Sequence, residues 1–240
     1  MTPYHLLPLF LALAGCSMQI QGLHDAPITL PPLPAAAGPP VSVLVCRFAD
    51  KRGDNFMRLS PAGLIPMVNL FYAGETFYYA DRGGFAGDTK RGHPQLMIGA
   101  LETSLPDLVA ASIREARPGW PIEVTASPDR CRSGGDAQYV IDGSIRRTEL
   151  RVHTSFLPLG LLSLVGAPAK FVDFIGEVDV EVRDARTGRA AWSHTFHTDE
   201  RRAVGLYYNR NSGREMFSAL LVDTVQRTST GTIHVAERGT

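Results

Sequence analysis

The chain has 240 residues, of which 44% are hydrophobic and 20% are charged, an ordinary balance for a globular protein. Lys and Arg together number 24, as do Asp and Glu, so the formal net charge is zero. This balance gives no overall field that would attract nucleic acid or an acidic surface, and we expect no nucleic-acid partner.

The N-terminus carries an apolar run, Leu6–Ala14, that leads into the sequence Leu-Ala-Gly-Cys at positions 13–16. The run is about nine residues long, which suits the hydrophobic region of an export signal and is too short to span a bilayer. This order resembles a bacterial lipobox, whose cysteine is acylated and becomes the first mature residue. We therefore expect a signal peptide at 1–15 and lipidation, including palmitate, at Cys16. The alternative is a chance cysteine after an apolar N-terminus.

The residues around this motif qualify the expectation in two ways. Residues 1–5 contain no Lys or Arg, where an export signal has a positive region, so a start codon farther upstream is an open alternative. Ser17 follows the cysteine where inner-membrane lipoproteins have Asp. By resemblance to bacterial lipoproteins, Ser17 favours a lipid anchor in the outer membrane, on its periplasmic side.

Residues 16–40 are predicted to be a lipidated, proline-rich tether and not a packed element. Five prolines lie in its second half: Pro31, Pro32, Pro34, Pro39 and Pro40. Such a composition favours an extended, semi-rigid spacer.

The first strong element is a strand at 41–49, where apolar residues occupy both faces, as in a covered central strand. It contains Cys46, which with Cys131 is left over once Cys16 is lipidated. In an oxidising compartment these two could form a disulfide. Two separate thiols, with Cys46 buried in its strand, are the alternative, since the sequence gives no distance between them.

Two apolar insertions, at about 59–80 and 154–170, interrupt the regular pattern. They are too short and too broken by Pro and Gly to cross a bilayer as helices. One interpretation is that they pack together as a second core. Another is that they form an exposed apolar surface for a partner, for other copies or for lipid. A third is a transmembrane pore hairpin. The candidate apolar contact residues are Leu64, Ile65, Phe71, Phe156, Leu159, Leu161, Leu162 and Leu164.

Two helices are predicted from apolar stripes at helical spacing, at 94–116 and 213–228. Pro106 lies inside the first and removes a backbone donor, so a kink or a restart is expected there. The residues after the second helix are polar, and 231–240 are expected to form a loose tail.

The remaining elements are predicted strands at 122–126, 137–150, 174–184 and 190–198, with a hairpin turn at 184–188. In the third strand Val178, Val180 and Val182 alternate with charged residues, which predicts an antiparallel sheet with one wet face. The order is β-α-β-β-β-β-α. We therefore expect one α+β domain over 41–230, a mixed and mostly antiparallel sheet with helices packed on one face.

No catalytic constellation is evident, and we expect no enzyme, no metal and no cofactor. His194 and His197 are three residues apart on a predicted strand and so point to opposite faces. The Gly-rich run at 83–87 lacks the Lys-Ser/Thr of a phosphate-binding loop.

Three segments resemble small envelope lipoproteins: Val-Ser-Val-Leu-Val-Cys-Arg-Phe-Ala-Asp-Lys-Arg at 41–52, Asp-Ala-Gln-Tyr-Val-Ile-Asp-Gly-Ser-Ile at 136–145, and Arg-Asp-Ala-Arg-Thr-Gly at 183–188 with Trp192 after it. The families concerned are the ABC-transport auxiliary lipoproteins and the relatives of the TolB N-terminal and curli-secretion lipoprotein folds. The resemblance covers about half of the mature chain. It implies a non-catalytic, often oligomeric part of an envelope export or transport machine.

Two functions are therefore expected from different classes. The first is a membrane-anchored periplasmic lipoprotein that acts as a scaffold or assembly component, bound to the membrane by its N-terminal lipid. Its partners would be other envelope proteins, and a homo-oligomer is a further possibility. The second is a periplasmic module that binds a lipid or another apolar ligand in a pocket lined by the insertions.

Overall fold

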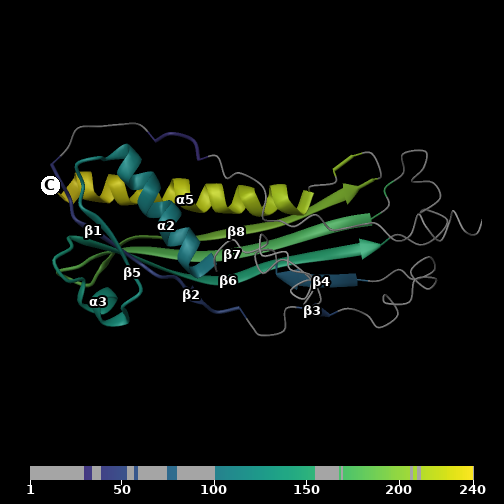
Figure 1. Ribbon diagram of the computed structural model, residues 1–240, viewed down its shortest axis with the longest axis horizontal. Coiled ribbons are helices and arrows are strands. Elements are labelled where there is room, and N and C mark those ends of the chain that lie inside the picture. The colour runs from purple at the N-terminus through teal and green to yellow at the C-terminus, as the bar shows by residue number, and fades with distance from the viewer. Residues whose placement is uncertain are drawn as a thin grey trace, which may run out of the picture.

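The computed structural model describes residues 30–33, 39–52, 57–58, 75–79, 101–154, 168, 170–205, 208–209 and 212–239. It has an α+β fold built on a mixed, mostly antiparallel sheet, as the sequence predicts (Figure 1). The elements in chain order are β1 (Val43–Cys46), β2 (Ala49–Asp50), β3 (Met57–Arg58), β4 (Glu75–Tyr79), α2 (Leu101–Ala116), β5 (Ile122–Thr125), α3 (Pro128–Ser133), β6 (Tyr139–Thr154), β7 (Lys170–Asp184), β8 (Ala190–Val204) and α5 (Ser212–Gly239).

Strand β6 organises the sheet. Its 16 residues span about 50 Å. Strand β7 pairs with one edge of β6 along its whole length, and β8 extends the sheet beyond β7. The other edge of β6 pairs in turn with β1, β2 and β4. Strand β1 is parallel to both β6 and β5, whereas β4, β6, β7 and β8 form antiparallel pairs.

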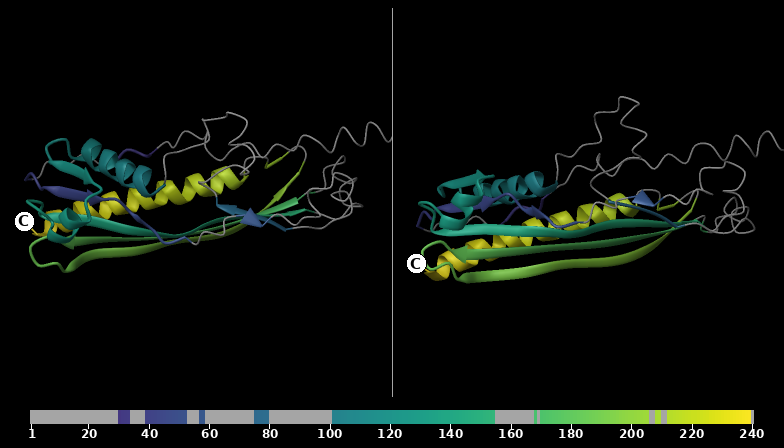
Figure 2. Two further views of the ribbon diagram at one scale, coloured as in Figure 1. Left: turned by 60° about the horizontal axis from the view of Figure 1, so that its bottom comes forward. Right: turned by 90° about the horizontal axis from the view of Figure 1, so that it is seen from below.

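Helices α2 and α5 pack on one face of this sheet and against each other (Figures 1 and 2). The 28 residues of α5 span about 42 Å, so the helix lies along most of the length of β7 and β8. Its side chains Phe217 and Leu221 are buried with Phe174 and Val178 of β7. The rings of Phe174 and Phe217 meet edge to face with centroids 6.0 Å apart.

The opposite face of the sheet is covered at one end by α3, which the sequence analysis missed. Leu44, Cys46 and Val140 are buried in a small second cluster with Cys131 and Ala185. Val43 and Val45 of β1 belong instead to the core under α2 and α5. Strand β1 is therefore covered on both faces, which confirms the covered strand expected at 41–49.

Helix α2 runs without a break from Leu101 to Ala116, so the restart expected at Pro106 is wrong. Pro106 has no N–H for the carbonyl of Glu102, four residues back. The backbone N–H of Phe48 donates to that carbonyl at 3.0 Å. The carbonyl of Glu102 therefore has a hydrogen-bond donor from the residues that follow β1, and the helix continues through Pro106.

Helix α5 continues to Gly239, so the loose tail expected at 231–240 is also wrong. Ile233 and Ala236 are buried in the main core. The hydroxyls of Thr224 and Thr232 donate at 2.8 Å to the carbonyls of Leu220 and Thr228 within the same helix. Polar residues can therefore occupy its buried face without leaving these hydroxyls unpaired.

Two other expectations need correction at their boundaries. Leu30 and Leu33 pack, half-buried, against the main core, so this part of the proline-rich segment is a packed element and not a free spacer. Residues 75–79 of the first apolar insertion form β4 and pair with β6 in the main sheet. Strands β6 and β7 also extend to Thr154 and Lys170, the two ends of the second insertion.

Candidate functional site

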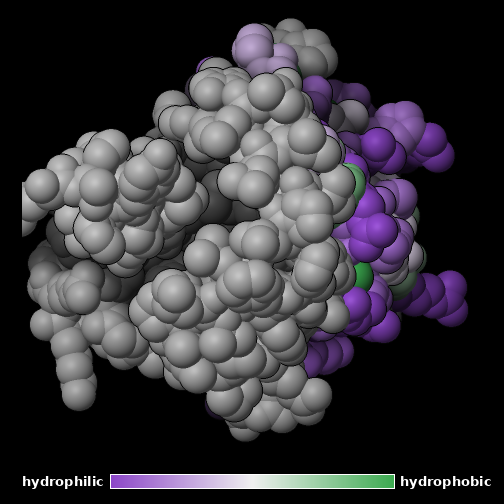
Figure 3. Space-filling view, turned by 90° about the vertical axis from the view of Figure 1, so that its right-hand side faces the viewer, coloured by the Kyte–Doolittle hydropathy of each residue, from purple (hydrophilic) through white to green (hydrophobic). Residues whose placement is uncertain are grey.

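The sheet face away from α2 and α5 is polar. Outside the region under α3, this open face consists of alternate residues of β6, β7 and β8. Hydrophilic side chains gather on that side of the molecule, at the right of the end-on view in Figure 3. The clean alternation of Val178, Val180 and Val182 with charged residues accounts for it, because successive side chains of a strand point to opposite faces.

Ion pairs connect the charged residues of the open face. Arg146 occupies the bulge between Ile145 and Arg147 and pairs with Glu177 and Asp179 of β7. The guanidinium of Arg201 on β8 binds both carboxylate oxygens of Asp173 at 2.6 Å. Because exposed ion pairs of this kind contribute little to stability, the face is better described as solvated than as a source of stability.

Hydrogen bonds from two arginines on this face hold the side chain of Glu149. Arg147 donates two hydrogen bonds to the carboxylate of Glu149, and Arg151 donates one more at 3.2 Å. The hydrogen bond with Glu149 is the main reason why the pKa of Arg147 is raised. Three guanidinium hydrogen bonds from two arginines therefore converge on the carboxylate of Glu149.

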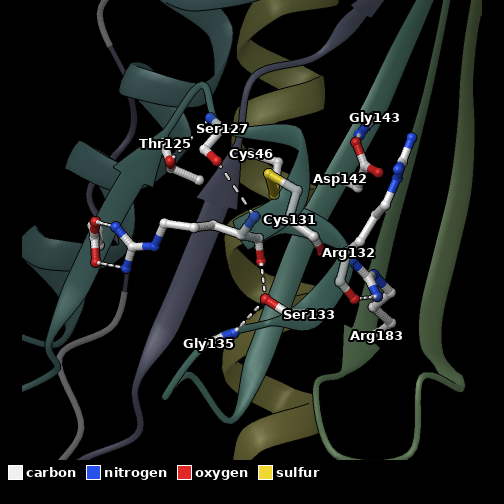
Figure 4. The surroundings of a disulfide bond; sticks show 12 residues. Cys46, Thr125, Ser127, Cys131, Arg132, Ser133, Gly135, Asp142, Gly143 and Arg183 are labelled. Atoms are coloured by element: carbon white, nitrogen blue, oxygen red, sulfur yellow. Dashed lines mark hydrogen bonds and ion pairs between the residues drawn. A yellow bond between two sulfur atoms is a disulfide. The ribbon is translucent and has the colours of Figure 1, made fainter.

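A disulfide joins Cys46 of β1 to Cys131 of α3, with the Cα atoms 5.9 Å apart (Figure 4). Ser127 caps the N-terminus of α3 by accepting a hydrogen bond from the backbone N–H of Arg130. At the other end, the guanidinium of Arg183 on β7 donates to the carbonyls of Cys131 and Arg132. A cation near the last carbonyls of a helix is favourable. Helix α3 is therefore held to the sheet by the disulfide, by Arg183 of β7 and by the ion pair of Arg130 with Glu123 of β5.

Beside the disulfide lies a hollow of about 510 Å³, bounded by α3, the end of β1 and strands β6 and β7. Arg47, Arg132 and Arg183 line it together with the carboxylates of Glu102 and Asp142. A second hollow of about 710 Å³ continues from it across β7 to β8 and shares Ala49, Asp142 and Arg183 with the first. Both signs of charge are present, so the surface offers polar contacts without selecting an anion or a cation.

Two carboxyl groups near this end, the exposed Glu123 and the half-buried Asp184, have lowered pKa values. The hydrogen bond from Arg130 is the main cause for Glu123. For Asp184 the main cause is the backbone N–H of Thr187, which donates to the carboxylate at 2.7 Å. Asp184 begins the turn between β7 and β8, where Gly188 has a φ of +67°, and this confirms the hairpin predicted at 184–188.

No group of three His, Cys, Asp or Glu side chains that could hold a metal ion exists in the described part of the chain. His194 and His197 lie opposite Val180 and Glu177 in the β7–β8 register, so they point to opposite faces, as predicted.

The other predicted site residues fall outside the described part of the chain. They are Cys16 and the eight apolar contact residues Leu64, Ile65, Phe71, Phe156, Leu159, Leu161, Leu162 and Leu164. The strands that flank both insertions are described, however. Glu75 pairs with His153, and Thr154 pairs with Lys170. Both apolar segments are thus joined to the sheet at one end, opposite to the end that carries the disulfide.

The sequence analysis also missed a buried polar network. The side chain of Arg52 is buried and binds Asp50 through two nitrogens, at 2.8 Å each. A third nitrogen donates to the buried hydroxyl of Thr148 at 2.8 Å. No signal in the sequence predicts this contact, because it depends on how β2 pairs with β6.

Several solved structures are similar in fold to this chain. A protein from Xanthomonas campestris of the family DUF330 is similar over 88% of this chain and 95% of its own, with 12% identity and a TM-score of 0.49. The PelC dodecamer from Paraburkholderia phytofirmans covers 82% and 94%, with 13% identity and a TM-score of 0.32. Lipoprotein GNA1162 from Neisseria meningitidis covers 78% and 99%, with 15% identity and a TM-score of 0.26.

The chain is thus distantly similar in structure to bacterial lipoproteins and to PelC. No protein-family model matches it, and no curated protein does. At these identities and TM-scores the likeness does not carry a function over to this chain. Within the described residues, no helix is both long enough and apolar enough to cross a bilayer.

Proposed function

We propose that this protein is a lipid-anchored scaffold or assembly component on the periplasmic side of the outer membrane, and that its two apolar segments make its working contacts. The observation that carries the proposal is the strand register that joins both segments to the same end of the sheet. Two stretches rich in apolar side chains at one end of an elongated domain form a contact region if they are exposed.

The disulfide supports the export part of the proposal. Disulfides persist in oxidising compartments such as the bacterial periplasm and are rare in the cytosol. The Cys46–Cys131 bond joins β1 to α3, two elements that the sequence separates by 85 residues. This agrees with the lipobox-like Leu-Ala-Gly-Cys sequence at 13–16, which predicts that the chain leaves the cytoplasm.

The anchor is tested by replacing Cys16 with Ser in the full chain. We expect the variant to be released from the membrane fraction, whereas the unaltered protein stays with it. A Cys16→Ser protein that remains membrane-bound contradicts the lipid anchor but leaves the apolar contacts untouched.

The contact region is tested with Leu161→Asp and Leu164→Asp in the full chain, with Ser163→Asp as a matched control that adds the same charge in the same segment. We expect the two Leu variants to keep the circular dichroism and unfolding midpoint of the wild type while losing crosslinks to envelope proteins. Unfolding of the Leu variants would place these residues in a core instead. Lipid that co-purifies with a monomer would favour the apolar-ligand module.

A further inference from the structure

Part of the proline-rich segment that precedes β1 lies back against the domain. Residues 30–33 are on the helix side of the sheet, beside α2 and α5 (Figures 1 and 2). The side chains of Leu30 and Leu33 are half-buried and pack against the main core. Pro31 and Pro32 between them are exposed. Within this stretch, the contact with the domain therefore depends on the two leucines.

A few residues farther on, the chain is attached to the domain a second time. Val41 is buried in the main core. The carbonyl of Ser42 accepts hydrogen bonds from the backbone N–H groups of Gln138 and Tyr139, at 2.9 and 3.2 Å. Strand β1 follows at once and is paired on both sides, with β5 and with β6. This second attachment, at the disulfide end of the sheet, belongs to the fold itself.

The contact at 30–33 is of a weaker kind. These four residues form no hydrogen bond with another described residue. Apolar burial stabilises in proportion to the area that is removed from water, and two half-buried leucines remove little of it. We therefore expect this contact to open while the domain stays folded.

Opening the contact changes how far the domain can stand from a lipid anchor at Cys16. With the contact closed, the chain from Cys16 first meets the domain at residue 30, on the helix side. With it open, the chain first meets the domain at residue 41, at the disulfide end. Residues 30–41 then lengthen the spacer by roughly 35 Å, at the rise of about 3.1 Å per residue of an extended proline-rich chain.

We propose that residues 30–33 are a releasable latch that sets the distance and the orientation of the domain at the membrane, an inference that rests on the lipid anchor of the proposed function. The closed latch favours an arrangement in which the helix layer faces the lipid and the polar open face is turned away from it. The open latch moves the attachment to the disulfide end. The end of the sheet that carries both apolar segments is then the end farthest from the membrane.

The latch is tested by the distance between two nitroxide labels in the full chain in detergent. The labels are placed at two exposed positions, by Pro32→Cys in the segment and by Thr230→Cys on α5. We expect one narrow distribution of distances, which Leu33→Asp should broaden and shift to longer values. Pro31→Asp is the matched control, because it adds the same charge at an exposed neighbouring position, and it should leave the distribution narrow.

The latch must also be separable from the fold. We expect Leu33→Asp and Pro31→Asp to have the same midpoint of urea unfolding as the unaltered chain, because the attachment at 41–42 and β1 are unaffected. A lower midpoint in Leu33→Asp would show that residues 30–33 are a fixed part of the domain, and would overturn the proposal. A distance distribution that is broad before any substitution, or that Leu33→Asp leaves unchanged, would do the same.

The orientation is tested on vesicles of phosphatidylethanolamine and phosphatidylglycerol that contain a nitroxide-labelled lipid. A fluorophore is attached to the full chain at Thr230→Cys on the helix layer, or at Ser193→Cys, an exposed position of the open face. We expect stronger quenching at 230 than at 193, and the loss of this difference in Leu33→Asp. Equal quenching at both positions in the chain with Leu33 would refute the proposed orientation. A chain that does not join the vesicles contradicts the lipid anchor instead, and the distances measured in detergent still decide the latch.

Discussion

The backbone N–H of Phe48 donates at 3.0 Å to the carbonyl of Glu102, the carbonyl for which Pro106 offers no helical donor. Phe48, which lies between β1 and β2, therefore supplies the donor that the proline inside α2 lacks. The strand end gains an acceptor, and the helix loses no hydrogen bond at its proline.

This contact predicts a small effect for Pro106→Ala. Removing a proline from a helix interior ordinarily stabilises the helix by about 3 kcal/mol. Because the Glu102 carbonyl is already paired, we expect the free energy of unfolding in urea to change by no more than about 1 kcal/mol. A gain near the full 3 kcal/mol would show that the Phe48 contact does not compensate for the proline.

The disulfide should make stability depend on reductant. Its ends are separated by 85 residues, and the chain-entropy model gives about 4–5 kcal/mol for a loop of that size. We expect the midpoint of urea unfolding to fall when the wild type is reduced. The variant with both Cys46→Ala and Cys131→Ala should start from a low midpoint and not respond to reductant. A wild-type midpoint that does not move would contradict the assignment of the bond.

Gly143 should not tolerate a side chain. A Cβ at this position would lie 2.8 Å from the backbone oxygen of Asp179 and 2.8 Å from the ring of Phe48. We expect Gly143→Ala to lower the free energy of unfolding by about 1–3 kcal/mol, as overpacking does. Gly119→Ala is the matched control, because a Cβ there meets nothing within 4 Å. Equal effects in the two variants would disprove the close packing of Phe48 on β6.

The end of α5 should be indispensable. A chain that stops after Thr230 loses the buried side chains of Ile233 and Ala236 and the ion pair between Glu237 and the buried Arg117. We expect its free energy of unfolding to drop by more than about 2 kcal/mol, from the lost burial alone. Deleting Thr240 alone should have no effect, and a stable protein ending at 230 would restore the loose tail that the sequence suggests.

The β7–β8 turn should contribute a pH-dependent term. The folded pKa of Asp184 is lowered, so its contribution is present above the ordinary value of 3.8 and is lost as the pH falls through the folded value. We expect Asp184→Asn to unfold at a lower temperature than the wild type at pH 7 and to show a smaller further decrease on acidification below pH 4. Parallel curves of unfolding temperature against pH for the two proteins would contradict this role.

Elements with a clear period were predictable from the sequence, and those shaped by tertiary context were not. The alternation through Val178, Val180 and Val182 located β7 because one face is buried and the other is wet. Helix α3 has six residues, too few to show a period. Strand β4 lies within an aromatic run, and its place between β3 and β6 follows only from its pairing with those two strands.

The candidate site was predictable to a smaller extent. The two cysteines were recognisable as a possible pair, but the distance between them depends on how β1 and β5 align, which a single sequence does not specify. The end of α5 was missed because polar residues such as Thr232, which satisfies its hydroxyl within the helix, look in the sequence like a solvated tail.

The place where the N-terminal segment joins the sheet determines how the fold responds to a pull. Residues 39–42 lead into β1 at the disulfide end, and β1 runs parallel to β6 toward the other end. A force on this segment, opposed at the far end of β6, therefore acts along the strands and strains several backbone hydrogen bonds at once in shear. If those hydrogen bonds broke, β1 would be pulled out of the sheet only as far as Cys46, its last residue, because the disulfide holds Cys46 to α3. The rest of the domain would then remain folded under load.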